Sequence, residues 1–201
     1  LVLVTHDDCT VRPDWVGAAR RLAQELPGAL VSGQVLPARD DVPIPSCRVA
    51  EIRQVYDDFR GMGELYPANM LVPRAAALEI GGFDESELLA SSEDLEFCAR
   101  WIESGRRFVV DPSLVVWHAD WRSPTALLHT WRAYAYGAGA FYGQRWGHGD
   151  RRMPRWIARE LVDRMATDVR RRWRRQPKHL EERSGFVVPL VRGVVAGLRR
   201  R

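Results

Sequence analysis

The first 120 residues alternate between short apolar runs and apolar positions at helical spacing. A nearly continuous apolar run of about four to eight residues is typical of a buried strand, whereas apolar residues three and four positions apart are typical of a helix with one buried face. On this basis the sequence predicts extended segments over 1–5, 29–36, 65–72, 108–110 and 114–118, and helices over 15–26, 52–59, 73–80 and 95–102. This alternation predicts an α/β protein in which helices flank a sheet.

Beyond residue 121 the pattern changes to longer helical segments. We expect an aromatic-rich helix over 125–146, a basic helix over 151–175 and a short apolar segment over 186–198. The last segment is shorter than the roughly 20 apolar residues that a membrane-spanning helix needs, and it contains Pro189 and Arg192. The sequence therefore predicts no membrane-spanning helix.

Charge changes sign at nearly the same place along the chain. The 201 residues carry a net charge of +4, and 46% are hydrophobic and 28% charged, which is ordinary for a folded globular protein. Residues 151–201 hold 15 Arg and one Lys against five acids, so this segment carries +11 and the first 150 residues carry −7. We therefore expect an α/β domain over 1–120, an aromatic helix packed on that domain over 121–150, and a basic amphipathic helical tail over 151–201.

The three cysteines, Cys9, Cys47 and Cys98, lie far apart and form no Cys-x-x-Cys pair. This spacing excludes a disulfide scaffold and a zinc finger evident from sequence. It is typical of a protein from a reducing compartment, so we expect a cytoplasmic location.

Two pairs of adjacent acids stand where side chains can carry out chemistry. Asp7 and Asp8 follow the opening strand, and in open α/β sheets ligands bind beyond the carboxyl ends of the strands. Adjacent carboxylates in a loop can hold Mg²⁺ or Mn²⁺ against phosphate oxygens, or they can form a solvated turn before the next helix. Glu93 and Asp94 open the helix predicted over 95–102, where a carboxylate can act as a general base or simply favour the helix dipole.

Two further polar residues lie near the ends of predicted strands. His118 ends the strand over 114–118, where an imidazole can complete a metal site with Asp8 or satisfy its hydrogen bonds within the protein. Asn69 follows a Tyr-Pro-Ala sequence and can simply form a turn. None of these residues by itself is specific for a function.

The order of these residues is more informative than any one of them. After the first acidic pair come residues 66–70 (Tyr-Pro-Ala-Asn-Met), 81–85 (Gly-Gly-Phe-Asp-Glu), the Glu-Asp pair at 93–94 with Arg100 behind it, and 115–118 (Val-Val-Trp-His). This series resembles the inverting family 2 glycosyltransferases of the GT-A fold, over residues 1 to 142. The resemblance implies a GT-A-like, Rossmann-like mixed sheet flanked by helices.

The resemblance also implies a donor site. Asp8 and His118 would bind a divalent metal, Mg²⁺ or Mn²⁺, and Asp7 would lie near the ribose or sugar of the donor, in the DxD motif of the family. His6 stands where the family places the first acid of that motif. The remaining positions that the resemblance assigns to the donor site are Asn69, Gly81 and Gly82.

The transfer chemistry that the resemblance implies rests on the second acidic pair. Asp94 would deprotonate the acceptor hydroxyl, with Glu93 as the alternative base, and the sugar would move in one displacement with inversion. The implied donor is a nucleotide-diphosphate sugar, and the implied acceptor is a glycan or a lipid-linked molecule. The implied protein is an inverting glycosyltransferase of polysaccharide biosynthesis at the cell envelope.

The resemblance begins with the strand that precedes the first acidic pair, at Leu1. In that family, the strand that binds the nucleobase precedes the strand with the DxD motif. We therefore expect an N-terminal part of the domain upstream of Leu1. The alternative to an active enzyme is a non-catalytic remnant of such an enzyme that docks on membranes.

Arginines surround a tryptophan in the basic segment, at residues 170–175 (Arg-Arg-Arg-Trp-Arg-Arg). Such a helix can lie on anionic lipid with its tryptophan among the headgroups, or it can be a solvated helix. Arginine-rich segments also bind nucleic acid, but no motif that reads nucleic acid accompanies this one, so nucleic acid ranks below a membrane surface. We expect peripheral binding at the inner face of the cell membrane.

Overall fold

The computed structural model describes residues 1–39, 47–59, 67–89, 91–119, 123–173 and 185–200. The chain divides into two compact units, one of Leu1–Asp84 with Asp94–Trp121 and one of Glu85–Glu93 with Arg122–Arg201. Residues 65 and 66 of the expected extended segment, and residues 174 and 175 of the expected basic helix, lie outside the described residues.

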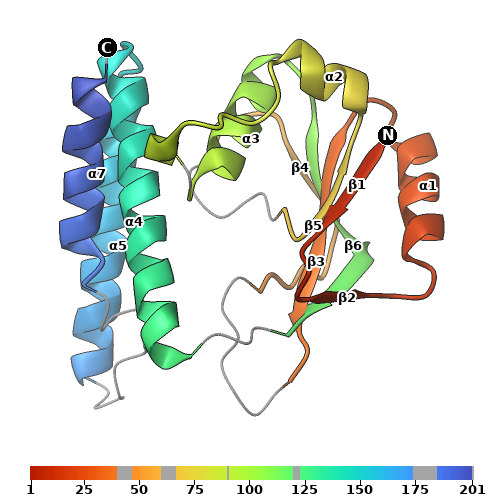
Figure 1. Ribbon diagram of the computed structural model, residues 1–201, viewed down its shortest axis with the longest axis horizontal. Helices are drawn as coiled ribbons and strands as arrows, with labels where there is room; N and C mark the ends of the chain where they lie inside the picture. The colour runs from red at the N-terminus through yellow and green to blue at the C-terminus, as the bar shows by residue number, and fades with distance from the viewer. Residues whose placement is uncertain (40–46, 60–66, 90, 120–122, 174–184, 201) are drawn as a thin grey trace. The chain divides into compact units, whose positions relative to one another are not determined.

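The first unit holds a mixed sheet, which has six strands among the described residues (Figure 1). The order across the sheet is β1-β5-β3-β6-β2, and β4 also pairs with β6. β3 and β6 are parallel and the other pairs are antiparallel, so β1, β3 and β6 run in the same direction and their carboxyl ends meet at one edge. The strands are β1 (Val2–Thr5), β2 (Cys9–Val11), β3 (Leu30–Pro37), β4 (Gln54–Tyr56), β5 (Asn69–Val72) and β6 (Phe108–His118).

Helices cover both faces of this sheet. α1 (Trp15–Glu25) packs on one face, and α2 (Arg74–Glu79) and α3 (Glu93–Glu103) contribute to the core on the other. Successive side chains of a strand point to opposite faces, so Val31 joins the first core and its neighbour Leu30 joins the second. The first unit is therefore an α/β fold with a mixed sheet flanked by helices, as the sequence predicts.

Two elements differ from the sequence prediction. The segment 52–59 contains strand β4 instead of a short helix, because these residues pair with β6 and Tyr56 stacks on Phe108 with ring centroids 5.5 Å apart. The strands expected over 108–110 and 114–118 form a single strand, β6. The residues between them bulge out of register with β3, while the pairing continues on both sides of the bulge.

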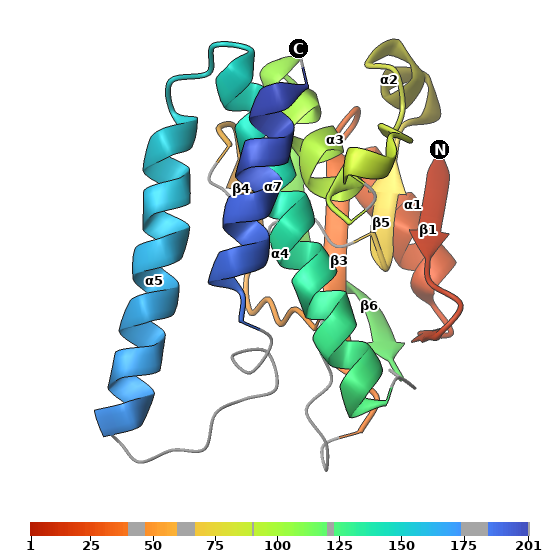
Figure 2. The same ribbon diagram turned by 60° about the vertical axis from the view of Figure 1, so that its left-hand side comes forward.

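The second unit contains the helices α4 (Pro124–Gly147), α5 (Met153–Trp173) and α7 (Val187–Arg199), and the short 3₁₀ helix η1 (Glu87–Leu89) (Figure 2). The aromatic helix and the basic tail therefore belong to one unit. Pro189 lies in the first turn of α7, where the N–H group that proline lacks would have no partner within the helix. The expected packing of 121–150 on 1–120 stays a prediction. Among the described residues, no helix is long and apolar enough to span a membrane.

Candidate functional site

Asp8 and His118 meet at the edge of the sheet where β1 and β6 end. After β1 the chain turns, with the Cys9 N–H donating to the His6 carbonyl over 3.2 Å, and β2 then runs along β6 with Cys9 opposite His118. The Ala119 N–H extends this ladder by donating to the Asp8 carbonyl over 2.9 Å. Asp8 Oδ2 therefore lies 3.2 Å from His118 Nε2, and the two side chains are only 7% and 5% exposed.

The thiol of Cys9 lies next to Asp8, in surroundings that disfavour a second negative charge. The Cys9 sulfur lies 3.9 Å from Asp8 Oδ1. Burial, together with the charge of Asp8, raises the pKa of the Cys9 thiol. In the absence of a metal ion the thiol is therefore neutral at neutral pH. Among the described residues, Asp8 and His118 are the pair in direct contact at this place.

The other two residues of the turn differ from Asp8 in their exposure. His6 and Asp7 are both exposed to solvent. Of the predicted metal and donor residues, the structure thus brings Asp8 and His118 into contact and leaves Asp7 on the surface next to them. A ligand at this edge of the sheet could contact the exposed Asp7 directly. It could reach Asp8 only where the nearly buried side chains of Asp8 and His118 contact each other.

Two protein ligands fit a metal ion that a substrate helps to bind. Among the described residues, no group of three or more His, Cys, Asp or Glu is placed to hold a metal. Mg²⁺, however, is commonly bound by one or two carboxylates together with substrate phosphates and water. Carboxylate oxygen suits Mg²⁺ and Mn²⁺, so such an ion would depend mainly on Asp8, with His118 as a supplementary ligand.

Asn69 is the first residue of β5, and its side chain is fully buried. Its Nδ2 donates to the carbonyls of Gln34, over 2.7 Å, and Leu114, over 2.9 Å. Its Oδ1 accepts a hydrogen bond from the indole N–H of Trp15, over 2.9 Å. The amide thus joins β5 to β3, β6 and α1, and any effect of Asn69 on a donor would act through these elements.

Gly81 and Gly82 form the end of α2. Both have positive φ, at 91° and 69°. Their N–H groups donate to the carbonyls of Leu78, over 3.0 Å, and Ala77, over 2.8 Å. This is the Schellman arrangement that ends a helix, and its left-handed residue is most often glycine. The structure therefore gives the two glycines a local conformational role.

Arg100 of α3 links the glycine turn to the rest of the first unit. Its guanidinium donates to the carbonyl oxygens of Ile80 and Gly82. Both carboxylate oxygens of Glu96, one helical turn earlier, accept hydrogen bonds from the same guanidinium over 2.6 Å each. Such a two-point ion pair fixes the plane of the guanidinium, so Arg100 is a positioning residue for the turn.

The second acidic pair, Glu93 and Asp94, begins α3 where the two units of the chain meet in sequence. Asp94 Oδ1 accepts a hydrogen bond from the Leu95 N–H over 2.7 Å, which satisfies one of the free donors of a first helical turn. Within the part of the chain that the structure describes, Glu93 Oε2 is buried and has no hydrogen-bond partner. Buried acceptors of this kind are uncommon and require an explanation.

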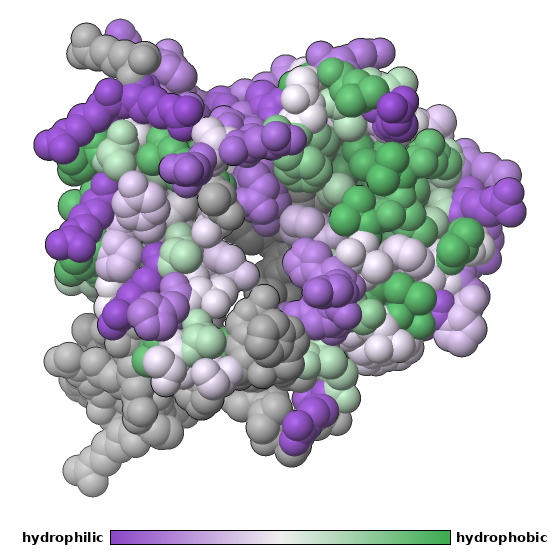
Figure 3. All heavy atoms as spheres, viewed as in Figure 1, coloured by the Kyte–Doolittle hydropathy of each residue, from purple (hydrophilic) through white to green (hydrophobic). Residues whose placement is uncertain are grey.

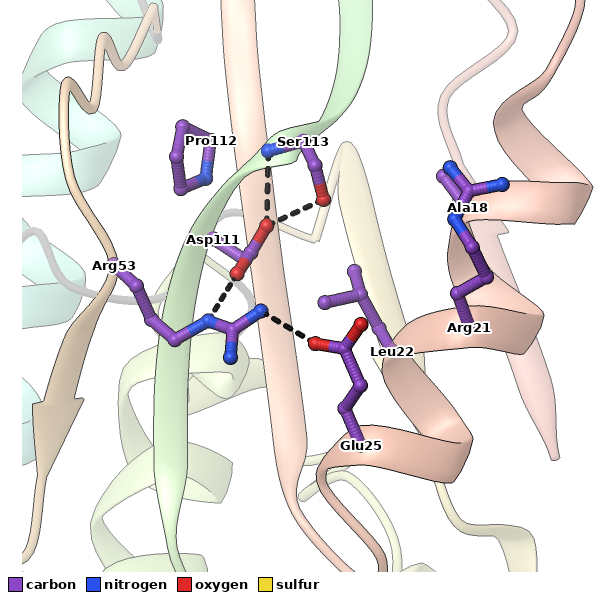
Figure 4. A pocket seen from close by; sticks show the side chains of 8 residues that line it. All are labelled: Ala18, Arg21, Leu22, Glu25, Arg53, Asp111, Pro112 and Ser113. Atoms are coloured by element: carbon purple, nitrogen blue, oxygen red, sulfur yellow. Dashed lines mark hydrogen bonds and ion pairs between the residues drawn. The ribbon is translucent and has the colours of Figure 1, made fainter.

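The structure also contains a pocket that the sequence did not indicate, between α1 and the bulge of β6 (Figure 4). Its volume is about 520 Å³. Its charged residues form a chain in which Arg53 donates to the buried Asp111 and, over 2.9 Å, to Glu25. The residues that line it are Ala18, Arg21, Leu22, Glu25, Arg53, Asp111, Pro112 and Ser113.

The carboxylate of Asp111 is the most enclosed charge of this pocket. Burial by itself raises the pKa of Asp111, but hydrogen bonds from the Ser113 N–H and hydroxyl, together with Arg53, outweigh burial and hold the pKa below its ordinary value. In the sequence, the bulge at this pocket corresponds to Asp-Pro-Ser at residues 111–113, a sequence that is typical of a turn. Because both carboxylate oxygens of Asp111 accept hydrogen bonds, from Ser113 and from Arg53, this chain of charges fixes the bulge.

No protein-family model matches the chain, and no curated protein matches it either. The geometry of the molecule thus contributes two observations of its own toward a function. One is the buried contact of Asp8 with His118 at the carboxyl edge of the sheet. The other is Glu93 Oε2 at the start of α3, which is buried and has no hydrogen-bond partner among the described residues.

Proposed function

We propose that this chain is the catalytic part of an inverting, metal-dependent glycosyltransferase of the GT-A type. It would move a sugar from a nucleotide-diphosphate sugar to a hydroxyl of a glycan or lipid-linked acceptor. The observation that carries this proposal is the buried contact between Asp8 and His118, at the carboxyl ends of strands that run in the same direction. Ligands of open α/β sheets bind at such an edge.

Asp8 and His118 would hold Mg²⁺ or Mn²⁺ at this site. When bound, the ion neutralises charge on the leaving nucleoside diphosphate. Asp7, exposed in the same turn, would contact the ribose or the sugar of the donor. Because His6 replaces an acid of the family motif, the turn offers two carboxylates, and ion binding depends more strongly on the phosphates of the donor.

The acidic pair at the start of α3 would provide the base that deprotonates the acceptor hydroxyl. A base needs an oxygen within hydrogen-bond reach of the substrate proton. Asp94 is the residue that the motif indicates, and one of its oxygens already accepts the Leu95 N–H. Glu93 Oε2 is buried without a hydrogen-bond partner among the described residues, which supports Glu93 as the alternative base.

The location that we propose is the inner face of the cell membrane, with peripheral binding. The support is the charge of residues 151–201, which hold 16 basic residues against five acids. The alternative function, a non-catalytic remnant of a glycosyltransferase that docks on membranes, shares this location. The two functions differ in donor binding, which only the enzyme requires.

Thermal unfolding of the chain with and without Mn²⁺, in the presence of UDP, GDP, dTDP or CDP, tests the proposal. A ligand that binds only the folded state must raise the Tm. We expect a rise that requires both Mn²⁺ and one particular nucleotide, which would also identify the nucleobase. If no nucleotide raises the Tm in the presence of Mn²⁺, this chain by itself has no donor site. The same measurement on a chain extended upstream of Leu1 then separates an incomplete enzyme, which gains the rise, from the remnant, which does not.

A further inference from the structure

α7 exposes a row of valines to solvent. Val187, Val188, Val191 and Val195 are 42, 60, 45 and 40% exposed. Because they stand three and four positions apart, they lie on one side of the helix, and we call this side the valine face. The opposite side is buried around Leu190, which is 0% exposed. α7 is therefore apolar on its buried side and on its exposed side.

Glycines fix α7 against α4 by direct backbone contact. A Cβ added at Gly193 or Gly197 of α7 would lie 2.0 or 2.2 Å from a carbonyl oxygen of α4. The same addition at Gly139 or Gly143 of α4 would lie 2.0 or 2.2 Å from a carbonyl oxygen of α7. Both helices thus carry glycines four positions apart, an arrangement that is common in helix pairs in membranes.

This backbone contact explains why the valines remain on the surface. Figure 2 shows α4 and α7 side by side, as the glycine contacts require. Helices that pack through glycines need few large apolar side chains between them. Leu190 and Val194 are buried, and the four valines of the valine face remain exposed.

Positive charge borders the valine face. Arg192 and Arg199 are exposed and are the charged residues of α7, and the exposed Arg200 follows directly. Arg192 stands one helical turn after Val188, and Arg199 one turn after Val195. Figure 3 shows green apolar spheres next to purple hydrophilic ones at the margin that α7 forms.

This combination is complementary to an anionic membrane surface. Arginine keeps its guanidinium at the phosphates while its stem lies along apolar material, and basic residues are attracted to anionic lipid. The sequence of α7 contains no acid, so a second copy of the valine face would offer these arginines no partner of opposite charge. Charge complementarity thus favours lipid over self-association.

The length of α7 decides how it can meet a membrane. Its 13 residues correspond to about 20 Å of helix, and the hydrocarbon core of a bilayer is about 30 Å thick. We propose that α7 lies in the plane of an anionic membrane surface, with the valine face at the boundary of the acyl chains and its arginines at the phosphates. The proposal rests on the membrane location given above and is independent of the transfer reaction.

Cosedimentation of the full chain with lipid vesicles tests this proposal. We expect binding to vesicles of phosphatidylcholine and phosphatidylglycerol in equal amounts, and little binding to phosphatidylcholine alone. The double variant Val191→Asp with Val195→Asp should bind at least about tenfold more weakly, because each substitution places a charge in the apolar layer. The matched control is Val16→Asp with Val49→Asp, which alters two exposed valines of the first unit and lowers the net charge equally.

A second pair of variants tests the contribution of charge. Arg192→Gln and Arg199→Gln should each weaken binding to the anionic vesicles about fivefold. The controls are the single variants Arg20→Gln and Arg74→Gln, which alter two exposed arginines of the first unit. High salt should reduce binding of the wild-type chain and should affect the two arginine variants of α7 less.

Three results would overturn the proposal. The first is a wild-type chain that does not bind anionic vesicles, and the second is equal weakening in the valine variants of α7 and in their control. The third is a dimer in sedimentation velocity that the α7 variants convert to a monomer, which assigns the valine face to a second copy.

Folding of the variants is checked by circular dichroism and by the Tm. If the aspartate pair lowers the Tm, Val191→Ser with Val195→Ser tests the same face without a new charge. Sugar transfer is not a readout of this experiment. Loss of the membrane proposal therefore leaves the proposed reaction standing, and failure to bind nucleotide leaves the membrane proposal standing.

Discussion

His118 Nε2 lies 3.2 Å from Asp8 Oδ2, and both side chains are nearly buried at the end of the sheet. An ion that binds both groups must therefore replace the direct contact between them. Such an exchange is favourable when phosphate oxygens complete the coordination of the ion. We thus expect metal and nucleotide to bind cooperatively at this site, and either one alone to bind weakly.

The first prediction concerns Asp8. Asp8→Ala removes the carboxylate ligand, so the rise in Tm that requires both Mn²⁺ and a nucleotide should disappear. The matched control is Glu51→Ala, which removes an exposed acid of the same unit and should keep the rise. An unchanged Mn²⁺-dependent nucleotide affinity in Asp8→Ala would remove Asp8 from the site.

The second prediction separates the two candidate bases. In a chain that includes the N-terminal part expected upstream of Leu1, Asp94→Asn keeps the size of the side chain and should leave donor binding intact, while sugar transfer falls by about 10²- to 10⁴-fold, as for other general bases. Glu93→Gln is measured beside it, and Glu103→Gln at the other end of α3 is the control. If transfer persists in Asp94→Asn and is lost in Glu93→Gln, the base is Glu93.

The third prediction concerns the stability that Asn69 provides. Asn69→Ala leaves the carbonyls of Gln34 and Leu114 and the indole N–H of Trp15 without the amide that they contact. Each buried polar group that loses its hydrogen-bond partner destabilises the folded state by about 1–3 kcal/mol. The free energy of unfolding, measured in urea, should therefore fall by roughly 3 kcal/mol or more. Gln24→Ala, on the exposed side of α1, should change it little, and a similar small change in Asn69→Ala would contradict this role.

The fourth prediction uses the glycine contacts of α7. Gly193→Ala places a Cβ only 2.0 Å from the carbonyl oxygen of Tyr136 in α4. The two helices must therefore separate. Overpacking of this kind costs about 1–3 kcal/mol, and the Tm should fall. Gly17→Ala in α1 is the control, because its Cβ meets only the end of the Arg21 side chain at 3.7 Å. That change should stabilise the protein by up to about 1 kcal/mol, and equal effects of the two changes would argue against the backbone contact.

The fifth prediction is the dependence of stability on pH through Asp150. Hydrogen bonds from Arg152 lower the pKa of Asp150 to about 2. An unfolded aspartate has a pKa of about 3.9, so the folded state binds this proton more weakly. The stabilisation is therefore complete above about pH 4 and is lost as the pH falls toward about 2. Asp150→Asn should reduce the loss of stability in this range, measured by urea unfolding, and Asp163→Asn, which removes an exposed partner of Arg159, should not.

The sequence by itself determined the local elements and part of the site. Helical spacing placed α1 and α3 within a few residues of their observed bounds, because each helix has one buried face that repeats every three to four residues. The sequence placed Asp8 after one strand and His118 at the end of another, and the hypothesis of a shared metal site required the two side chains to lie close together. The structure brings them into contact.

Only the tertiary structure decided what depends on segments that are distant in the chain. Residues 54–56 form a strand because β6 supplies their hydrogen bonds, and periodicity over so few residues cannot distinguish a strand from a helix. The amide of Asn69 bonds to three elements far from it in sequence, and the glycines of α7 are explained by the backbone of α4. Local patterns encode which side of an element is buried, whereas the partner that buries it is fixed only when the whole chain packs.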